Sequence, residues 1–192
     1  AMYAVRSEGI DPANGRERFI KKNGLPTYTW DANDQVVVGD NNPDAQGSVG
    51  LNVAYKGFYL NASFMYQWGA QSYNETLLNK VENADVRGSN VDRRVLTQRW
   101  MNPGDIAPFY DMGNQTKTQV TTRFVQDYDY FNFSGLSLGY DFSRELISKW
   151  RLRSLGLRFN MNDICRWSTV KEERGTSYPF SRSFSFTLNI GI

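Results

Sequence analysis

Five segments of the chain alternate apolar and polar residues with a period of two, which is the pattern of a β-strand with two different faces. In the last of them, large apolar residues are separated only by small uncharged ones, as in Phe184-Ser-Phe186 and Leu188-Asn-Ile190. A second segment keeps the alternation over eleven residues, a length that matches the ~9–11 residues of a membrane-spanning strand. The five predicted strands are 48–55, 58–68, 132–142, 154–164 and 182–192.

Two local signals refine these strands. Lys56-Gly57 separates the first two strands by two residues, which predicts a tight hairpin with glycine supplying a positive φ. In segment 132–142 the apolar residues change parity near Ser134-Gly135, which predicts a β-bulge. Aromatic residues stand at both ends of the apolar face of 58–68, where the two interfacial girdles of a membrane barrel would lie.

The connections alternate in length: two residues, about 60, then 11, then 17. Short turns alternating with long loops are typical of outer-membrane barrels, whose long loops lie outside the cell, whereas soluble sandwiches carry turn signals every ~8–12 residues. On this interpretation 58–68 and 154–164 run outward, and 132–142 and 182–192 run inward. Five strands alone would leave two unpaired edges in lipid. The predicted fold is therefore all-β, an antiparallel meander forming the C-terminal section of a large transmembrane β-barrel.

Composition narrows the possible functions. The 192 residues carry a net charge of +2, which gives no basic footprint for nucleic acid. Histidine is absent and cysteine occurs once, so histidine-based triads, histidine metal ligands and intramolecular disulfides are excluded. No catalytic constellation, metal site or cofactor motif emerges. Aromatic residues make up 15% of the chain, which suits an all-β core, a sugar-binding surface or the girdles of a barrel.

Candidate binding residues fall into two groups. If the apolar stripes face lipid, the opposite parity faces a watery lumen, where polar side chains would contact the plug of a barrel or its substrate. These lumen candidates are Asn61, Gln67, Arg158, Asn160 and Asn162. Residues 9–47 and 69–120 read as external loops, the second with a short helix within 74–86. There Trp100 and Tyr110 are candidates for stacking on a sugar, or else for packing inside the loop.

Several short motifs, in their order and spacing, resemble the SusC/RagA-type TonB-dependent outer-membrane transporters of Gram-negative bacteria. The resemblance extends over nearly the whole of residues 1–192. The motifs are Gly9-Ile-Asp-Pro-Ala-Asn-Gly15, Val38-Gly-Asp-Asn-Asn-Pro43, Tyr55-Lys-Gly-Phe58, Gln98-Arg-Trp-Met-Asn-Pro-Gly-Asp105, Arg123-Phe-Val125, Leu136-Ser-Leu-Gly-Tyr140, Asn162-Asp-Ile164 and Glu173-Arg-Gly-Thr-Ser-Tyr-Pro179.

This resemblance implies a plugged barrel of about 22 strands, of which residues 1–192 would supply the last five or so. It further implies a SusD-like surface lipoprotein as a lid and energy from the TonB complex, reached through an N-terminal part that precedes this segment. The remaining partners would be the rest of the barrel, the plug and outer-membrane lipid. The resemblance transfers no ligand-binding residue to this region.

Three functions remain in competition. The first is a fragment of an outer-membrane transporter that imports a nutrient, either glycan or peptide, without catalysis. The second is a soluble, aromatic-rich β-sandwich that binds carbohydrate. The third, an enzyme on a small outer-membrane barrel, has the least support because the sequence shows no acid–base pair. A soluble sandwich would turn its apolar stripes inward, whereas a membrane barrel would turn them toward lipid.

Overall fold

A computed structural model of residues 1–192 describes every residue except 89, 112, 115 and 172–181. The motif 173–179 used in the sequence comparison therefore lies outside the described residues. The chain divides into two compact units, which are described separately. Unit 1 comprises residues 1–43 and 70–127, and unit 2 comprises residues 44–69 and 128–192.

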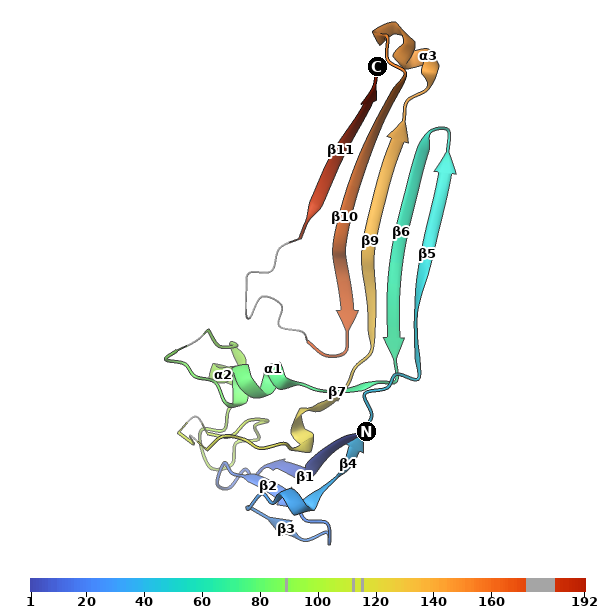
Figure 1. The fold of residues 1–192 in the computed structure, drawn as a ribbon. Helices are drawn as coiled ribbons and strands as arrows, with labels where there is room; N and C mark the ends of the chain where they lie inside the picture. Colours follow the sequence, from blue (N-terminus) through green and yellow to red (C-terminus); the bar gives the residue numbers. More distant parts are fainter. Residues whose placement is uncertain (89, 112, 115, 172–181) are drawn as a thin grey trace. The chain divides into compact units, whose positions relative to one another are not determined.

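Unit 2 is one antiparallel sheet of five strands in the order β11-β10-β9-β6-β5 (Figure 1). The expected all-β fold and the antiparallel meander are confirmed. The predicted bounds of 58–68 hold without change, while the strand predicted at 154–164 continues four residues further. The strands are β5 (Ala45–Tyr55), β6 (Phe58–Trp68), β9 (Tyr130–Asp141), β10 (Ser154–Ser168) and β11 (Phe184–Gly191).

A bulge interrupts the pairing of β9 where the sequence predicts one. Ser63 pairs with Gly135 and Phe64 pairs with Phe133, so Ser134 is the extra residue opposite β6. Across the sheet, Asn162 pairs with Gly135 and Cys165 with Phe133, so the bulge continues into β10. Because one extra residue inverts the parity of a strand, the bulge returns Phe131 and Phe133 to the same face as the leucines of β9.

The register gives the sheet two chemically different faces. Residues that pair across the strands form rows on each face. One row of the apolar face pairs Val53 with Leu60, Leu60 with Leu138, and Leu138 with Phe159. This face is uncovered within unit 2: Phe186 is 77% exposed and Phe58 is 61% exposed. Aromatic residues lie at both of its ends. The end aromatics are Tyr55, Phe58 and Tyr140 at one end, and Tyr66, Trp68, Phe131 and Trp167 at the other.

Short connections join the strands at one end of the sheet. Lys56 and Gly57 both have positive φ, 46° and 88°, which is the conformation of a type I′ hairpin turn. A Cβ on Gly57 would lie 2.5 Å from the carbonyl oxygen of Asp141, so glycine is required there by space as well as by φ. Between β9 and β10 the chain forms α3 (Arg144–Ile147) and a 3-10 turn, η4 (Ser148–Trp150).

In unit 1, residues 9–47, which the sequence indicates as an external loop, contain short strands. The segment contributes to a four-stranded antiparallel sheet in the order β3-β2-β1-β4, whose strand β1 begins before residue 9 (Figure 1). These strands escape a search for alternation because two are very short and β1 buries the adjacent residues Ala4 and Val5. The strands are β1 (Met2–Ile10), β2 (Glu17–Ile20), β3 (Pro26–Thr27) and β4 (Gln35–Gly39), and η1 (Ala32–Asp34) precedes β4.

The second part of unit 1 packs short helical turns on a small apolar core. The helix predicted within 74–86 is present as α1 (Glu75–Leu77) followed by a π-helical turn, η2 (Leu78–Glu82). Leu77, Val81, Val95, Phe109 and Phe124 form the buried core. None of the described helices has the length and apolar character needed to cross a membrane. The other elements are β7 (Gln71–Tyr73), α2 (Arg94–Thr97), η3 (Thr122–Phe124) and β8 (Val125–Asp127).

Candidate functional site

All five lumen candidates lie on the polar face of the sheet in unit 2. Asn61 and Asn160 share a register row and are separated by Ser137 of the intervening strand. Arg158 and Asn162 occupy the rows on either side of Asn160, and Gln67 lies at the opposite end of β6 from the hairpin turn. The row through Asn61 is entirely polar and uncharged: Asn52, Asn61, Ser137, Asn160 and Ser185.

Hydrogen bonds hold this row across the strands. The Ser137 hydroxyl donates to Oδ1 of Asn160 at 2.8 Å, and Nδ2 of Asn160 donates to the Ser185 hydroxyl at 3.4 Å. Asn61 and Asn162 are exposed on the same face. The row therefore offers amide donors and acceptors to a polar solute while Asn160 keeps a fixed orientation.

The neighbouring row is built around Tyr59, which the sequence placed on this face but did not mark as a candidate. The side chain of Tyr59 lies over Gly139, and a Cβ at Gly139 would overlap its ring. Nε of Arg158 donates to the Tyr59 hydroxyl at 2.7 Å, and the guanidinium carbon is 5.4 Å from the ring centroid. Glycine thus creates the space in which an aromatic ring and a cation lie flat on the sheet.

A second arginine occupies the far end of the polar face. Arg166 places its guanidinium 4.1 Å from the ring centroid of Tyr130 and donates to the Tyr128 hydroxyl at 2.5 Å. Gln67 donates to the carbonyl oxygen of Tyr128 at 3.3 Å. Sequence analysis missed Arg166 because the predicted strand ended at 164. The alternation that places Arg158, Asn160 and Asn162 on the polar face, continued beyond residue 164, would have placed Arg166 there as well.

Substituting Gly139 tests this arrangement. Gly139→Ala is expected to lower the free energy of unfolding by about 1 kcal/mol, because the added methyl group forces Tyr59 out of its rotamer and away from Arg158. Denaturant unfolding in detergent measures the loss. Gly50→Ala is the matched control on the same face, since a Cβ there meets no atom within 4 Å. In a Tyr59→Ala background the cost of Gly139→Ala should nearly vanish, and a cost that persists would contradict the overlap.

Both loop aromatics belong to unit 1 and contact other residues of this unit. Trp100 lies against Gly15, where a Cβ would be 2.5 Å from the indole ring, and its Nε1 donates to the carbonyl oxygen of Pro12 at 2.9 Å. Tyr110 is buried, with its hydroxyl 2.9 Å from the carbonyl oxygen of Thr116, and burial raises the pKa of this hydroxyl. Tyr110 also borders a polar cavity of about 650 Å³.

The same unit holds a buried ionic cluster that sequence analysis did not find. Nη2 of Arg123 donates to Oε2 of Glu17 at 2.7 Å and to Oε1 of Glu82 at 2.5 Å. Burial raises the pKa of Glu82, and Arg123 opposes that change. Beside this cluster, Arg99 donates to the carbonyl oxygens of Glu82 and Tyr110 at 2.6 and 3.2 Å. The residues come from distant segments, so no local motif reveals the cluster.

Among the described residues, no three histidine, cysteine or acidic side chains gather as metal ligands. The polar face carries neutral amides and hydroxyls, two arginines that lie against aromatic rings, and the carboxylate of Asp141. Such groups bind polar solutes or a protein surface by hydrogen bonds.

Comparisons with known proteins place the fold. Over its full length the chain matches a chain of the RagAB peptide importer in its open-open state, with a TM-score of 0.77 and 16% identity. The closed-closed state of this importer matches 99% of the chain, with a TM-score of 0.73 and 16% identity. A structure of the RagAB peptide transporter matches 88% of the chain, with a TM-score of 0.71 and 17% identity.

At these identities the likeness concerns the fold alone. The chain spans only 22%, 23% and 19% of the three matched chains, respectively. No protein-family model matches the sequence, and no curated protein shows a significant match. Residues 1–192 therefore have the fold of about one fifth of a much larger importer chain.

Proposed function

We propose that the chain is a section of a nutrient-importing outer-membrane β-barrel, with the apolar face of its sheet toward lipid and the polar face toward the lumen. One observation carries this proposal: an apolar face and a hydrogen-bonded polar face run without interruption across all five strands of unit 2. The five lumen candidates then line the interior wall and contact the plug or a passing solute.

Strand length and aromatic placement support the lipid-facing assignment. β5 and β6 have 11 residues each, which suits a tilted strand crossing the hydrocarbon layer. The aromatics at both ends of the apolar face correspond to the two girdles found at membrane–water interfaces. A soluble sandwich would need a second sheet packed on this face, and the described part of unit 2 contains only one sheet. The carbohydrate-binding sandwich is therefore not favoured.

The two edges of the sheet support the assignment to a larger barrel. Within the described residues, β5 pairs only with β6 and β11 pairs only with β10. A lipid-exposed strand edge leaves backbone N–H and C=O groups without partners, so the remainder of the barrel must pair with both edges. We assign residues 1–192 as the C-terminal section of that barrel.

The substrate and partners are proposed by analogy with the matched structures and from the sequence resemblance. The structures are of a peptide importer, so we favour peptide over glycan as the imported nutrient. A SusD-like surface lipoprotein would act as the lid, and the TonB complex would supply energy through the plug, in the outer membrane of a Gram-negative bacterium. No catalysis is assigned to this region.

A pair of adjacent substitutions tests the proposal. Phe64 lies at the centre of β6 on the apolar face and contacts Phe133 at a ring-centroid distance of 4.7 Å, while Ser63 points to the polar face. Phe64→Arg is expected to cost ~2–4 kcal/mol and to block assembly of the complete barrel, since a charge would sit near the bilayer midplane. Ser63→Arg should assemble and appear at the surface.

Heat-modifiable migration on gels measures assembly, and uptake of labelled peptides by whole cells measures transport. Assembly of both variants to the same extent would contradict the assignment of the faces. Normal assembly of the parent barrel without peptide uptake would leave the barrel assignment standing and reject peptide as the substrate.

A further inference from the structure

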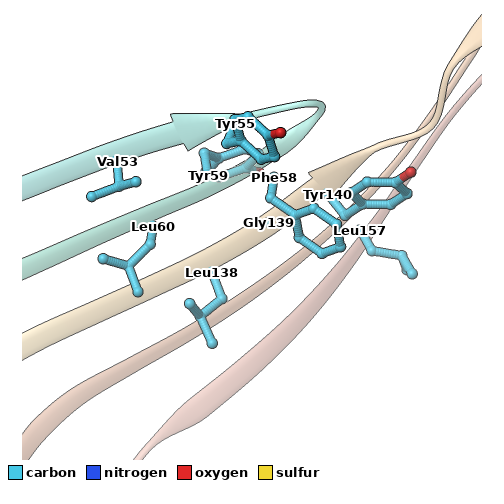
Figure 2. A pocket seen from close by; sticks show the side chains of 9 residues that line it. All are labelled: Val53, Tyr55, Phe58, Tyr59, Leu60, Leu138, Gly139, Tyr140 and Leu157. Atoms are coloured by element: carbon cyan, nitrogen blue, oxygen red, sulfur yellow. The ribbon is translucent and has the colours of Figure 1, made fainter.

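A shallow groove crosses the apolar face near the hairpin turn of β5 and β6 (Figure 2). Its volume is about 480 Å³, within the range of small-molecule sites. Leu60 of β6 and Leu138 of β9 line it, and the rings of Phe58 and Tyr140 are 4.2 Å apart between their centroids. Nearly all of the groove is apolar, so it suits a hydrocarbon chain rather than a polar ligand.

Basic residues cluster at the end of the sheet where this groove opens. The connection between β9 and β10, residues 142–153, carries four basic residues and one acidic residue, a net charge of +3. The basic residues are exposed, and none forms a salt bridge within the described part of the chain. They are Arg144, Lys149, Arg151 and Arg153.

The connection also carries exposed apolar residues, which is the composition of a segment at a membrane interface. Trp150 is 63% exposed and Leu146 is 54% exposed. Tryptophan beside lysine and arginine is enriched where the headgroups meet the hydrocarbon layer. Lys56 adds a fifth basic residue from the neighbouring hairpin, and we call these five residues the basic collar. The Nζ of Lys56 is 5.2 Å from the ring centroid of Tyr55, a residue that lines the groove.

Backbone hydrogen bonds hold these two connections side by side. The amide of Asp141 donates to the carbonyl oxygen of Gly57 at 2.8 Å, which places the hairpin turn against the start of the basic connection. The carboxylate of Asp141 belongs to the polar face, where it lies next to Gly156. At the opposite end of the sheet, Arg166 is accompanied by the carboxylates of Asp44 and Asp129, whereas the connection at the groove end has a net charge of +3.

We infer that the groove and its basic collar bind one anionic phospholipid of the bilayer. An acyl chain occupies the groove between Leu60 and Leu138, while the headgroup phosphate is held by the lysine and arginine side chains at the turns. The inference rests on the proposed function, because only a lipid-facing sheet presents the groove to phospholipid. It adds to that function a defined lipid site on the side opposite the long loops.

The complete barrel in detergent, titrated with phosphatidylglycerol and with phosphatidylcholine of equal chain length, tests the inference by native mass spectrometry. Phosphatidylglycerol is expected to bind more tightly. Arg144→Gln/Lys149→Gln should weaken that binding about 25-fold, since each basic residue near an anionic lipid surface contributes about fivefold. Both positions are exposed and helical, and glutamine has nearly the same helix propensity, so the fold should persist.

Lys21→Gln/Lys22→Gln is the matched control, because it removes two exposed positive charges from unit 1 and should leave the affinity unchanged. A phosphatidylglycerol with six-carbon chains should bind poorly, since it cannot fill the groove. Equal affinity for the two headgroups, equal affinity for the short-chain lipid, or an equal loss in the control variant would overturn the lipid site while leaving an assembled, transporting barrel intact. Failure of the parent chain to join a barrel would instead overturn the proposed function.

Discussion

Deletion of Phe184–Ile192 is expected to abolish surface display of the complete barrel rather than to weaken it. β11 pairs with β10 along eight consecutive residue pairs, from Met161–Phe184 to Ser154–Gly191. Its removal exposes the backbone groups of β10 to hydrocarbon, and each unpaired group there costs several kcal/mol. The apolar side chains lost with the strand also belong to the uncovered face. Labelling of intact cells with an impermeant reagent measures display.

A matched variant keeps the strand and changes only its polar face. Ser185→Ala/Thr187→Ala/Asn189→Ala preserves the backbone pairing of β11 and removes one hydrogen bond from Asn160. This variant should reach the surface at nearly the normal level. In a soluble sandwich, losing an edge strand would leave a folded protein. Surface labelling of the deletion variant at the normal level would therefore rule out a barrel-closing role for β11.

The strands of unit 2 were predictable because each has one apolar and one polar face, which leaves a strict two-residue period in the sequence. β6 shows this in the simplest way: one face is apolar from Phe58 to Trp68 and the other carries Asn61, Ser63 and Gln67. Even the bulge at Ser134 was predictable, since an inserted residue inverts the parity of everything that follows it. A strand's two-residue period thus encodes both its face and its irregularities.

Unit 1 was much less predictable because its strands are short and are specified by distant contacts. β3 has two residues and β2 has four, too few to establish a period. β4 contains a run of three valines, which periodicity cannot distinguish from a buried helical turn. The helix predicted within 74–86 was correct in kind, but it ends as the π-helical turn η2 rather than as a regular helix.

The sequence predicted which face of the sheet carries the candidate residues, but it did not predict which side chains lie next to them. Asn61 and Asn160 were expected on one face and share a row, but the sequence does not reveal that Ser137 lies between them. Tyr59 became significant only through its overlap with Gly139, and the register of two strands that are 80 residues apart in sequence creates this overlap. Pairwise register is long-range information, so a single sequence without a known partner strand does not specify it.

Substitution of Arg123 by methionine is expected to destabilise unit 1 by about 3–5 kcal/mol, because it leaves two buried carboxylates without their shared cation. The side chains of Glu17 and Glu82 are 6% and 0% exposed. Arg123 also donates from Nη1 to the carbonyl oxygen of Pro108 at 2.7 Å, so the loss affects three segments of the unit. Hydrogen exchange at the amides of β1 measures the opening free energy in the complete barrel.

The stability lost in Arg123→Met should become smaller as the pH falls. Burial raises the pKa of Glu82 above its ordinary value even with Arg123 present, and losing the arginine raises it further. A carboxyl group whose pKa is higher in the folded state stabilises the fold below the pKa of the unfolded state, and this contribution is lost as the pH rises through the folded-state pKa. The opening free energy of the variant should therefore be closest to that of the parent in mild acid and furthest below it at neutral pH.

Two further variants separate the buried charge from general damage. Arg123→Met/Glu17→Gln/Glu82→Gln should recover most of the loss, since no uncompensated charge remains in the interior. Arg18→Met removes an arginine from the exposed ion pair with Glu8 and should have little effect, because solvent screens that pair. If the triple variant opens as easily as Arg123→Met, the missing volume and the lost hydrogen bond to Pro108 would account for the instability, and the charges of Glu17 and Glu82 would not.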